Sequence, residues 1–183
     1  MKGKIALVLM EGFEETEAVI PVDVLRRIGE DVILCGAPLV SGAHGVKIGT
    51  DCRIEDIIPE EISVLILPGG MPGAANLRDS DLVVGLVKKV YGLGKFVAAI
   101  CAAPIVLQRA GIISGRNFTC YPSFKDEVGD TDYTGKMTER DGLIITGKGP
   151  GAAFEFAFRI ADAIGKRSEA EQVFGSMFVV SGR

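Results

Sequence analysis

The thiol of Cys101 is the side chain best suited to nucleophilic chemistry, because it stands where an expected strand gives way to an expected helix. The apolar run 96–100 is typical of a buried parallel strand, and the alanines and proline of 102–104 suit a helix's first turn. The unpaired N–H groups and positive dipole end of a helix favour thiolate over thiol. Free cysteine is also commonly a small buried hydrophobe, so this stretch alone leaves a nucleophile and an inert core thiol equally open.

Two other stretches could supply polar groups to that thiol. Residues 68–73 contain three glycines directly after the apolar run 63–67, so their backbone N–H groups can approach a ligand closely. They match neither phosphate-binding fingerprint. Glu17 belongs to an acidic run at the start of a predicted helix, where solvated carboxylates are favourable in any case. By itself, therefore, the sequence around Glu17 does not indicate catalysis.

The elements that must position these residues alternate along the chain. Strands are predicted at 5–10, 32–35, 63–67, 96–100, 117–121 and 143–146, and helices before Gly29, from Asp79 to 92, and at 105–111, 152–164 and 168–180. This alternation predicts an α/β, flavodoxin-like, doubly wound, mostly parallel sheet with helices on both faces. The glycine-interrupted stretch 37–51 predicts a small hairpin arm. Parallel strands end at one edge, which would bring 11–17, 68–73, 101–104 and 121–123 together.

Composition limits the class of protein. The 183 residues are 48% hydrophobic, which indicates one domain over 1–183. A net charge of −4 and the absence of any basic run longer than Arg26-Arg27 argue against a nucleic-acid partner. No segment approaches the ~20 apolar residues of a membrane span, and the first apolar run is too short for a signal peptide. We therefore expect a cytoplasmic protein.

The cysteines and the single histidine do not form a metal-binding pattern. Cys35, Cys52, Cys101 and Cys120 are widely spaced without a Cys-x-x-Cys pair, and His44 lies in the predicted arm as an expected solvated residue. We therefore expect no metal and no cofactor, and four reduced thiols rather than a disulfide framework.

Seven short motifs run in order across nearly the whole chain. They are EETE (14–17), PVDVLRR (21–27), LPGG (67–70), AAICAAP (98–104), DGLI (141–144), GPG (149–151) and FEFA (154–157). With these motifs the chain resembles the DJ-one family, the parkinsonism-associated deglycases within the PfpI and class I glutamine-amidotransferase-like superfamily. The resemblance implies that Cys101 is the reactive cysteine, Glu17 its partner carboxyl group, and Gly70 and Ala102 the backbone N–H donors of an oxyanion site.

The chain departs from the family pattern at one place. Tyr121 stands before a proline where many members carry a histidine, so a proton relay through that histidine is not available, although a tyrosine hydroxyl could orient a substrate. Cys101 is followed by Ala102, and not by the histidine that marks the protease-like branch. A peptidase is therefore not expected.

The resemblance implies an enzyme whose cysteine attacks reactive dicarbonyls such as methylglyoxal, or their early adducts on proteins or nucleotides, and releases lactate or glycolate. An alternative is a redox sensor or redox-regulated chaperone that works through oxidation of Cys101. A scaffold with an inert thiol is the third possibility. Family members are commonly homodimers, and the arm at 42–48 could serve such an interface.

Overall fold

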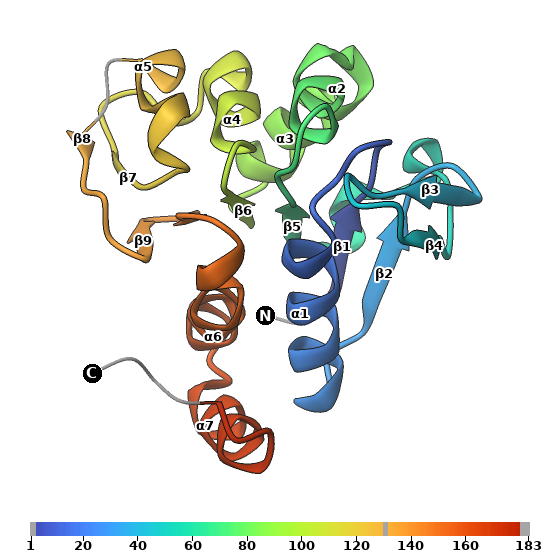
Figure 1. The fold of residues 1–183 in the computed structure, drawn as a ribbon, viewed down its shortest axis with the longest axis vertical. Coiled ribbons are helices and arrows are strands. Elements are labelled where there is room, and N and C mark those ends of the chain that lie inside the picture. The colour runs from blue at the N-terminus through green and yellow to red at the C-terminus, as the bar shows by residue number, and fades with distance from the viewer. Residues whose placement is uncertain (1–2, 130–131, 180–183) are drawn as a thin grey trace.

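A six-stranded sheet forms the centre of the computed structural model, which describes residues 3–129 and 132–179 (Figure 1). The strands lie in the order β2-β1-β5-β6-β10-β9, with bounds Val32–Cys35, Lys4–Val8, Ile62–Leu67, Phe96–Ile100, Ile144–Gly147 and Thr138–Asp141. Neighbouring strands are parallel except β9, which runs antiparallel to β10. The predicted mostly parallel, flavodoxin-like sheet is confirmed.

Helices cover both faces of the sheet, because alternate residues of each buried strand point to opposite sides. On one face Ile5, Leu7 and Ile66 pack with the core residues of α1 and α6, and on the other Val8, Leu65 and Leu67 pack with those of α3 and α4. In Figure 1, α2, α3 and α4 lie together at the top, whereas α1, α6 and α7 lie below them. The helices are α1 Glu15–Arg27, α2 Gly73–Asp79, α3 Asp81–Gly92, α4 Pro104–Ala110, α5 Lys125–Val128, α6 Ala153–Ala163 and α7 Arg167–Ser176.

The predicted hairpin arm is present as an antiparallel pair, β3 Leu39–Ser41 and β4 Lys47–Gly49. Short 3-10 turns occupy Ile54–Asp56, Pro59–Glu61, Pro122–Phe124 and Pro150–Ala152. Among the described residues, none of the helices has both the length and the apolar character needed to cross a bilayer.

Several predicted boundaries differ from the structure. The helix expected from Asp79 is α3, which begins after Ser80, whose hydroxyl accepts the N–H of Val83 at 3.3 Å. Helix α2, which precedes it, was not predicted. The strand expected at 117–121 is only β7, Asn117–Phe118, which pairs with β8, Asp132–Tyr133, outside the main sheet. Its next residue, Thr119, donates its N–H to the side chain of Thr146 instead of a ladder partner. The last helix ends at Ser176, and Val180, its expected end, lies outside the described residues.

Backbone hydrogen bonds join the segments that follow the carboxyl ends of the strands. The N–H of Glu14 donates to the carbonyl of Gly69 at 2.9 Å, and the N–H of Gly73 donates to that of Gly12 at 3.1 Å. The N–H of Tyr121 donates to the carbonyl of Cys101 at 2.9 Å. Backbone hydrogen bonds therefore hold together, around Cys101, the segments that the sequence predicted to meet at this edge of the sheet.

Candidate active site

Cys101 occupies a strained turn between β6 and α4. Its φ of +63° lies in the left-handed region, which a non-glycine residue adopts at a cost of about 1–2 kcal/mol. Two hydrogen bonds hold it there: its N–H donates to the carbonyl of Gly147 at 2.9 Å, and its carbonyl accepts the N–H of Tyr121. Such a strand-to-helix turn resembles the nucleophile elbow of hydrolases, in which the reacting side chain is presented at the sheet edge.

Glu17 reaches this turn from the first turn of α1 and is completely buried. Its Oε2 accepts the N–H of Gly69 at 2.8 Å. Its Oε1 is also buried and accepts no N–H or O–H among the described residues, while the Cys101 thiol lies within hydrogen-bonding reach of the carboxyl group. The structure therefore brings the two side chains together as the family resemblance implied.

Gly69 permits this close approach, and Gly70 lets its segment pass close to the backbone of residues 12–14. A Cβ on Gly69 would lie 2.6 Å from the Cβ of Cys101 and 2.7 Å from Oε2 of Glu17. A Cβ on Gly70 would lie 2.3 Å from the backbone nitrogen of Glu14, and its φ of +85° is one that side chains rarely adopt. Any larger residue at position 69 would force the Glu17 carboxyl group and the Cys101 thiol apart.

Burial dominates the electrostatics of the pair. It raises the pKa of Glu17 to about 7, against the opposing hydrogen bond from Gly69. Burial, followed by the negative charge of Glu17, raises the pKa of Cys101 to about 12, while the N–H groups of Gly70 and Ala102 pull it down. The N–H groups of Gly70 and Ala102 favour the thiolate, as the sequence predicted for the helix end, but desolvation outweighs them and the net direction of the pKa is upward.

The two acidic groups influence each other, because a charge on Glu17 disfavours a charge on Cys101. When Glu17 keeps the proton, the repulsion it exerts on a Cys101 thiolate disappears, and the two backbone N–H groups still face the sulfur. Gly70 and Ala102 both direct N–H groups at the Cys101 sulfur, and their role as oxyanion donors stays a prediction.

Tyr121 is joined to Cys101 through the backbone, but its side chain turns toward another surface. It is 47% exposed and lines a cavity of about 540 Å³ with Met137, Lys148 and Gly149. A Cβ on Gly149 would lie 3.4 Å from the tyrosine ring. The cavity adjoins the segment that carries Cys101, and a substrate-orienting role for Tyr121 stays a prediction.

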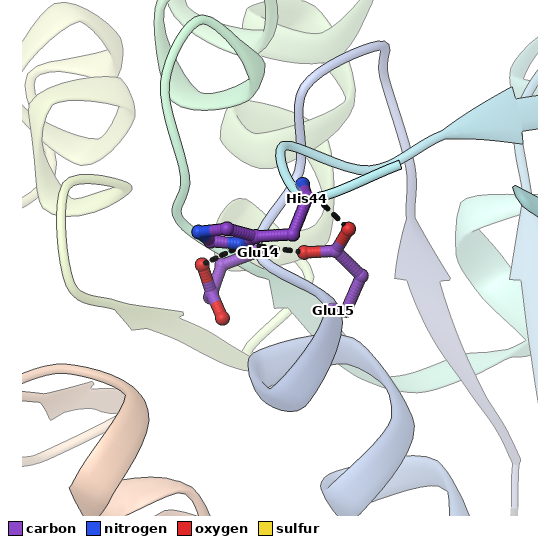
Figure 2. Close-up of side chains that lie close together, drawn as sticks. All are labelled: Glu14, Glu15 and His44. Atoms are coloured by element: carbon purple, nitrogen blue, oxygen red, sulfur yellow. Dashed lines mark hydrogen bonds and ion pairs between the residues drawn. The ribbon is translucent and has the colours of Figure 1, made fainter. Parts of the chain in front are cut away.

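His44 is exposed, as the sequence predicted, but it is not simply solvated. Figure 2 shows it beside Glu14 and Glu15, with Nδ1 3.0 Å from Oε2 of Glu15 and 3.4 Å from Oε2 of Glu14. Glu15 also accepts the backbone N–H of His44 at 2.7 Å and that of Val46 at 3.3 Å. Gly42 makes room for this contact, because a Cβ there would lie 2.4 Å from the Glu15 carboxyl carbon. Glu15 therefore connects the hairpin arm to α1, in the same first turn that carries Glu17.

These three residues are also the group within the described chain whose ligand atoms, all within 4.8 Å of one another, could hold a metal ion. The hydrogen bond to Glu15 and the charges of Glu14 and Glu15 raise the pKa of His44. The contacts among the three side chains account for their closeness. Sequence reasoning missed this cluster because it joins residues from two elements far apart in the chain.

The fold and the site define a flavodoxin-like protein with a cysteine in a strained strand-to-helix turn and a buried carboxyl group beside it. The sequence profile of the DJ-1/PfpI family matches residues 3–163, and the chain belongs to that family. It is 40% identical over 181 residues to the Parkinson disease protein 7 homolog of Danio rerio, covering 94% of this chain and 96% of the relative. It is 35% identical over 167 residues to the glutathione-independent glyoxalase DJR-1.2 of Caenorhabditis elegans, covering 88% and 89%.

The three-dimensional comparison agrees with the sequence comparison. The crystal structure of Drosophila melanogaster DJ-1beta superposes with a TM-score of 0.93 at 35% identity, covering 99% of this chain and 100% of the other.

Proposed function

We propose that this protein is a cysteine-dependent enzyme acting on small reactive dicarbonyls, or on their early adducts, in the manner of a glyoxalase that needs no cofactor. The observation that carries the proposal is the buried Glu17 carboxyl group beside the Cys101 thiol, with the N–H groups of Gly70 and Ala102 facing the sulfur. The worm relative named a glutathione-independent glyoxalase supports the same substrate class.

The first step is addition of the Cys101 sulfur to the aldehyde carbon of a 2-oxoaldehyde. A carbon–sulfur bond forms, the carbonyl π bond breaks, and the negative charge moves from sulfur to the new alkoxide oxygen. The sulfur then no longer needs the N–H groups of Gly70 and Ala102, which become available to that oxygen. Because these donors are fixed by the backbone, they cost little reorganisation when the charge moves.

The second step moves one hydrogen. Conversion of a 2-oxoaldehyde into a 2-hydroxy acid transfers the aldehyde hydrogen, as a proton, to the neighbouring carbon and adds one water. Glu17 can take and return that proton, because a pKa raised to about 7 lets it serve as both base and acid near neutral pH. Hydrolysis of the resulting thioester by water releases the hydroxy acid and restores the thiol.

The test is turnover of methylglyoxal by wild type and by Cys101→Ala, with lactate measured directly. We expect a loss of at least about 1,000-fold in kcat/KM, because the nucleophile is absent. Cys52→Ser is the matched control, since it removes a thiol outside the site and leaves turnover unchanged. A phosphine reductant is needed, because dithiol reductants themselves react with dicarbonyls. Turnover that survives in Cys101→Ala would overturn the proposal.

Oxidation of Cys101 is the second candidate function, and the same assay separates it from the first. The Glu17 carboxyl group could stabilise a sulfinate as it would a thiolate. Selective conversion of Cys101 to sulfinate by peroxide, in a protein without dicarbonyl turnover, would favour a redox sensor.

A further inference from the structure

Cys35 and Cys52 form a pair of thiols outside the candidate active site. Cys35 ends strand β2 and is completely buried, whereas Cys52 is partly exposed. Their sulfur atoms lie 3.3 Å apart, with the Cys52 thiol directed at the Cys35 sulfur. The mechanism proposed above uses neither residue.

The main chain holds the two cysteines opposite each other. They face one another across an isolated parallel bridge, and the N–H of Gly36 donates to the carbonyl of Cys52 at 2.9 Å. On the other side the N–H of Cys52 donates to the carbonyl of Leu34 at 3.3 Å. Neighbouring strands place α-carbons within the separation that a disulfide spans. Since a disulfide bond is about 2.0 Å long, the sulfurs need to approach by only roughly 1 Å.

The two thiols differ in access to solvent. Cys52 lines a cavity of about 180 Å³ together with Lys4, Asp51 and Glu61, so a small polar oxidant can reach it. Cys35 lies behind it among apolar core residues, and burial raises the pKa of its thiol. In this arrangement an oxidant in solution can react with the Cys52 sulfur, and the Cys35 sulfur is close enough to react with Cys52 afterwards.

We propose that Cys35 and Cys52 form a reversible disulfide when a hydroperoxide oxidises Cys52. The Cys52 sulfur attacks one peroxide oxygen, an S–O bond forms, the O–O bond breaks, and the leaving oxygen departs as water. The Cys35 sulfur then attacks the Cys52 sulfur, an S–S bond forms, the S–O bond breaks, and the proton of Cys35 leaves with the second water. Two thiols are oxidised by two electrons and one hydrogen peroxide is reduced to two waters. A dithiol or phosphine reverses the change.

The disulfide would close the base of the hairpin arm. The chain between the two cysteines contains β3, β4 and His44, which contacts Glu15 at the start of α1. Oxidation would therefore covalently fix the segment that covers the helix carrying Glu17. It protects Cys52 from further oxidation at the same time, because a disulfide cannot proceed to sulfinate without first being opened.

The test uses the full chain carrying Cys101→Ala, so that the elbow thiol cannot compete for the oxidant. Trypsin cleaves after Arg27, Lys47 and Arg53, which places Cys35 and Cys52 on separate peptides, 28–47 and 48–53. After hydrogen peroxide we expect these two peptides linked by a bond that a phosphine releases. Cys120, which is buried and donates its thiol to the carbonyl of Tyr121, should stay unmodified in the same digest.

Cys35→Ala in that background is the matched variant, in which Cys52 should proceed to sulfinate. A second measurement needs no substitution at either cysteine: oxidation should raise the melting temperature by about 5–10 °C, as closure of a loop of about 15 residues would. The proposal is overturned if Cys52 reaches sulfinate equally fast with and without Cys35. It is also overturned if peroxide links neither peptide while the melting temperature stays unchanged.

Discussion

Glu17 accepts the N–H of Gly69 with one carboxyl oxygen at 2.8 Å and keeps the other oxygen buried without an N–H or O–H donor among the described residues, beside Cys101. The first contact fixes the orientation of the carboxyl group. The carboxyl group and the thiol then influence each other's protonation. The titrations of Glu17 and Cys101 are therefore coupled. The coupling can be tested by substituting either residue or by varying the pH.

Glu17→Gln should change how stability depends on pH. The pKa of Glu17 is raised from 4.5 to about 7, so the unfolded chain loses this proton at lower pH than the folded one. The stabilisation is complete below about pH 4.5 and is lost as the pH rises to about 7. Over that range the free energy of unfolding of wild type should fall by about 3 kcal/mol relative to that of Glu17→Gln, measured by urea unfolding at a series of pH values. If the free energies of unfolding of the two proteins change with pH in parallel, the pKa of Glu17 is not raised.

Gly69→Ala should damage the site more than the fold. Its new methyl group would lie 2.6 Å from the Cβ of Cys101, so one of the two must move, and we expect a rate loss of at least about 100-fold with destabilisation of about 1–3 kcal/mol. Gly85→Ala is the control, because α3 leaves open space around that position and alanine is the better helix former by about 1 kcal/mol. Equal effects of the two substitutions on turnover would refute this account.

Cys101→Gly should unfold at higher denaturant concentration than Cys101→Ala. Glycine normally destabilises a fold relative to alanine by about 0.5–1 kcal/mol, but at a φ of +63° it avoids a strain of about 1–2 kcal/mol. The net expectation is a glycine variant more stable by roughly 0.5–1 kcal/mol, determined from urea midpoints. If Cys101→Ala is instead more stable than Cys101→Gly, the positive φ at position 101 carries no conformational strain in the alanine variant.

Glu15→Ala should release the hairpin arm. The carboxylate accepts two backbone N–H groups of the arm, from His44 and Val46, and removal of a charged acceptor costs about 1–3 kcal/mol. Hydrogen exchange of those two amides should accelerate, while amides of β6 keep their protection. His44→Ala is the comparison, because its side chain is 71% exposed and its loss should cost under about 1 kcal/mol. Unchanged exchange in Glu15→Ala would show that other contacts hold the arm.

The sequence predicted the parts of the site that depend on local pattern. Cys101 could be placed at a strand-to-helix turn, and the glycines of 68–73 at the end of a buried strand, because apolar runs and glycines mark those positions directly. Glu17 could be selected only through the family resemblance, since an acidic helix start is ordinary. The raised pKa of Cys101 was not predictable, because desolvation depends on how α1, β5 and β6 pack together.

Contacts between distant segments account for the remaining differences. The pairing of His44 with Glu15 and the approach of Cys35 to Cys52 both depend on where the arm folds back, which hydrophobic periodicity does not encode. Helix α2 was not predicted, and α3 begins after Ser80 instead of at Asp79 because the Ser80 hydroxyl caps its first turn.

The hydrogen bond from Cys101 to Gly147 has a consequence for the order of events during biosynthesis. The elbow is clamped by a strand, β10, that leaves the ribosome well after the cysteine itself. A nascent chain ending before β10 carries the thiol without the geometry that distinguishes it from any other cysteine. The labelling rate of Cys101 should therefore change only when β10 joins the sheet, and it would report completion of the sheet during folding.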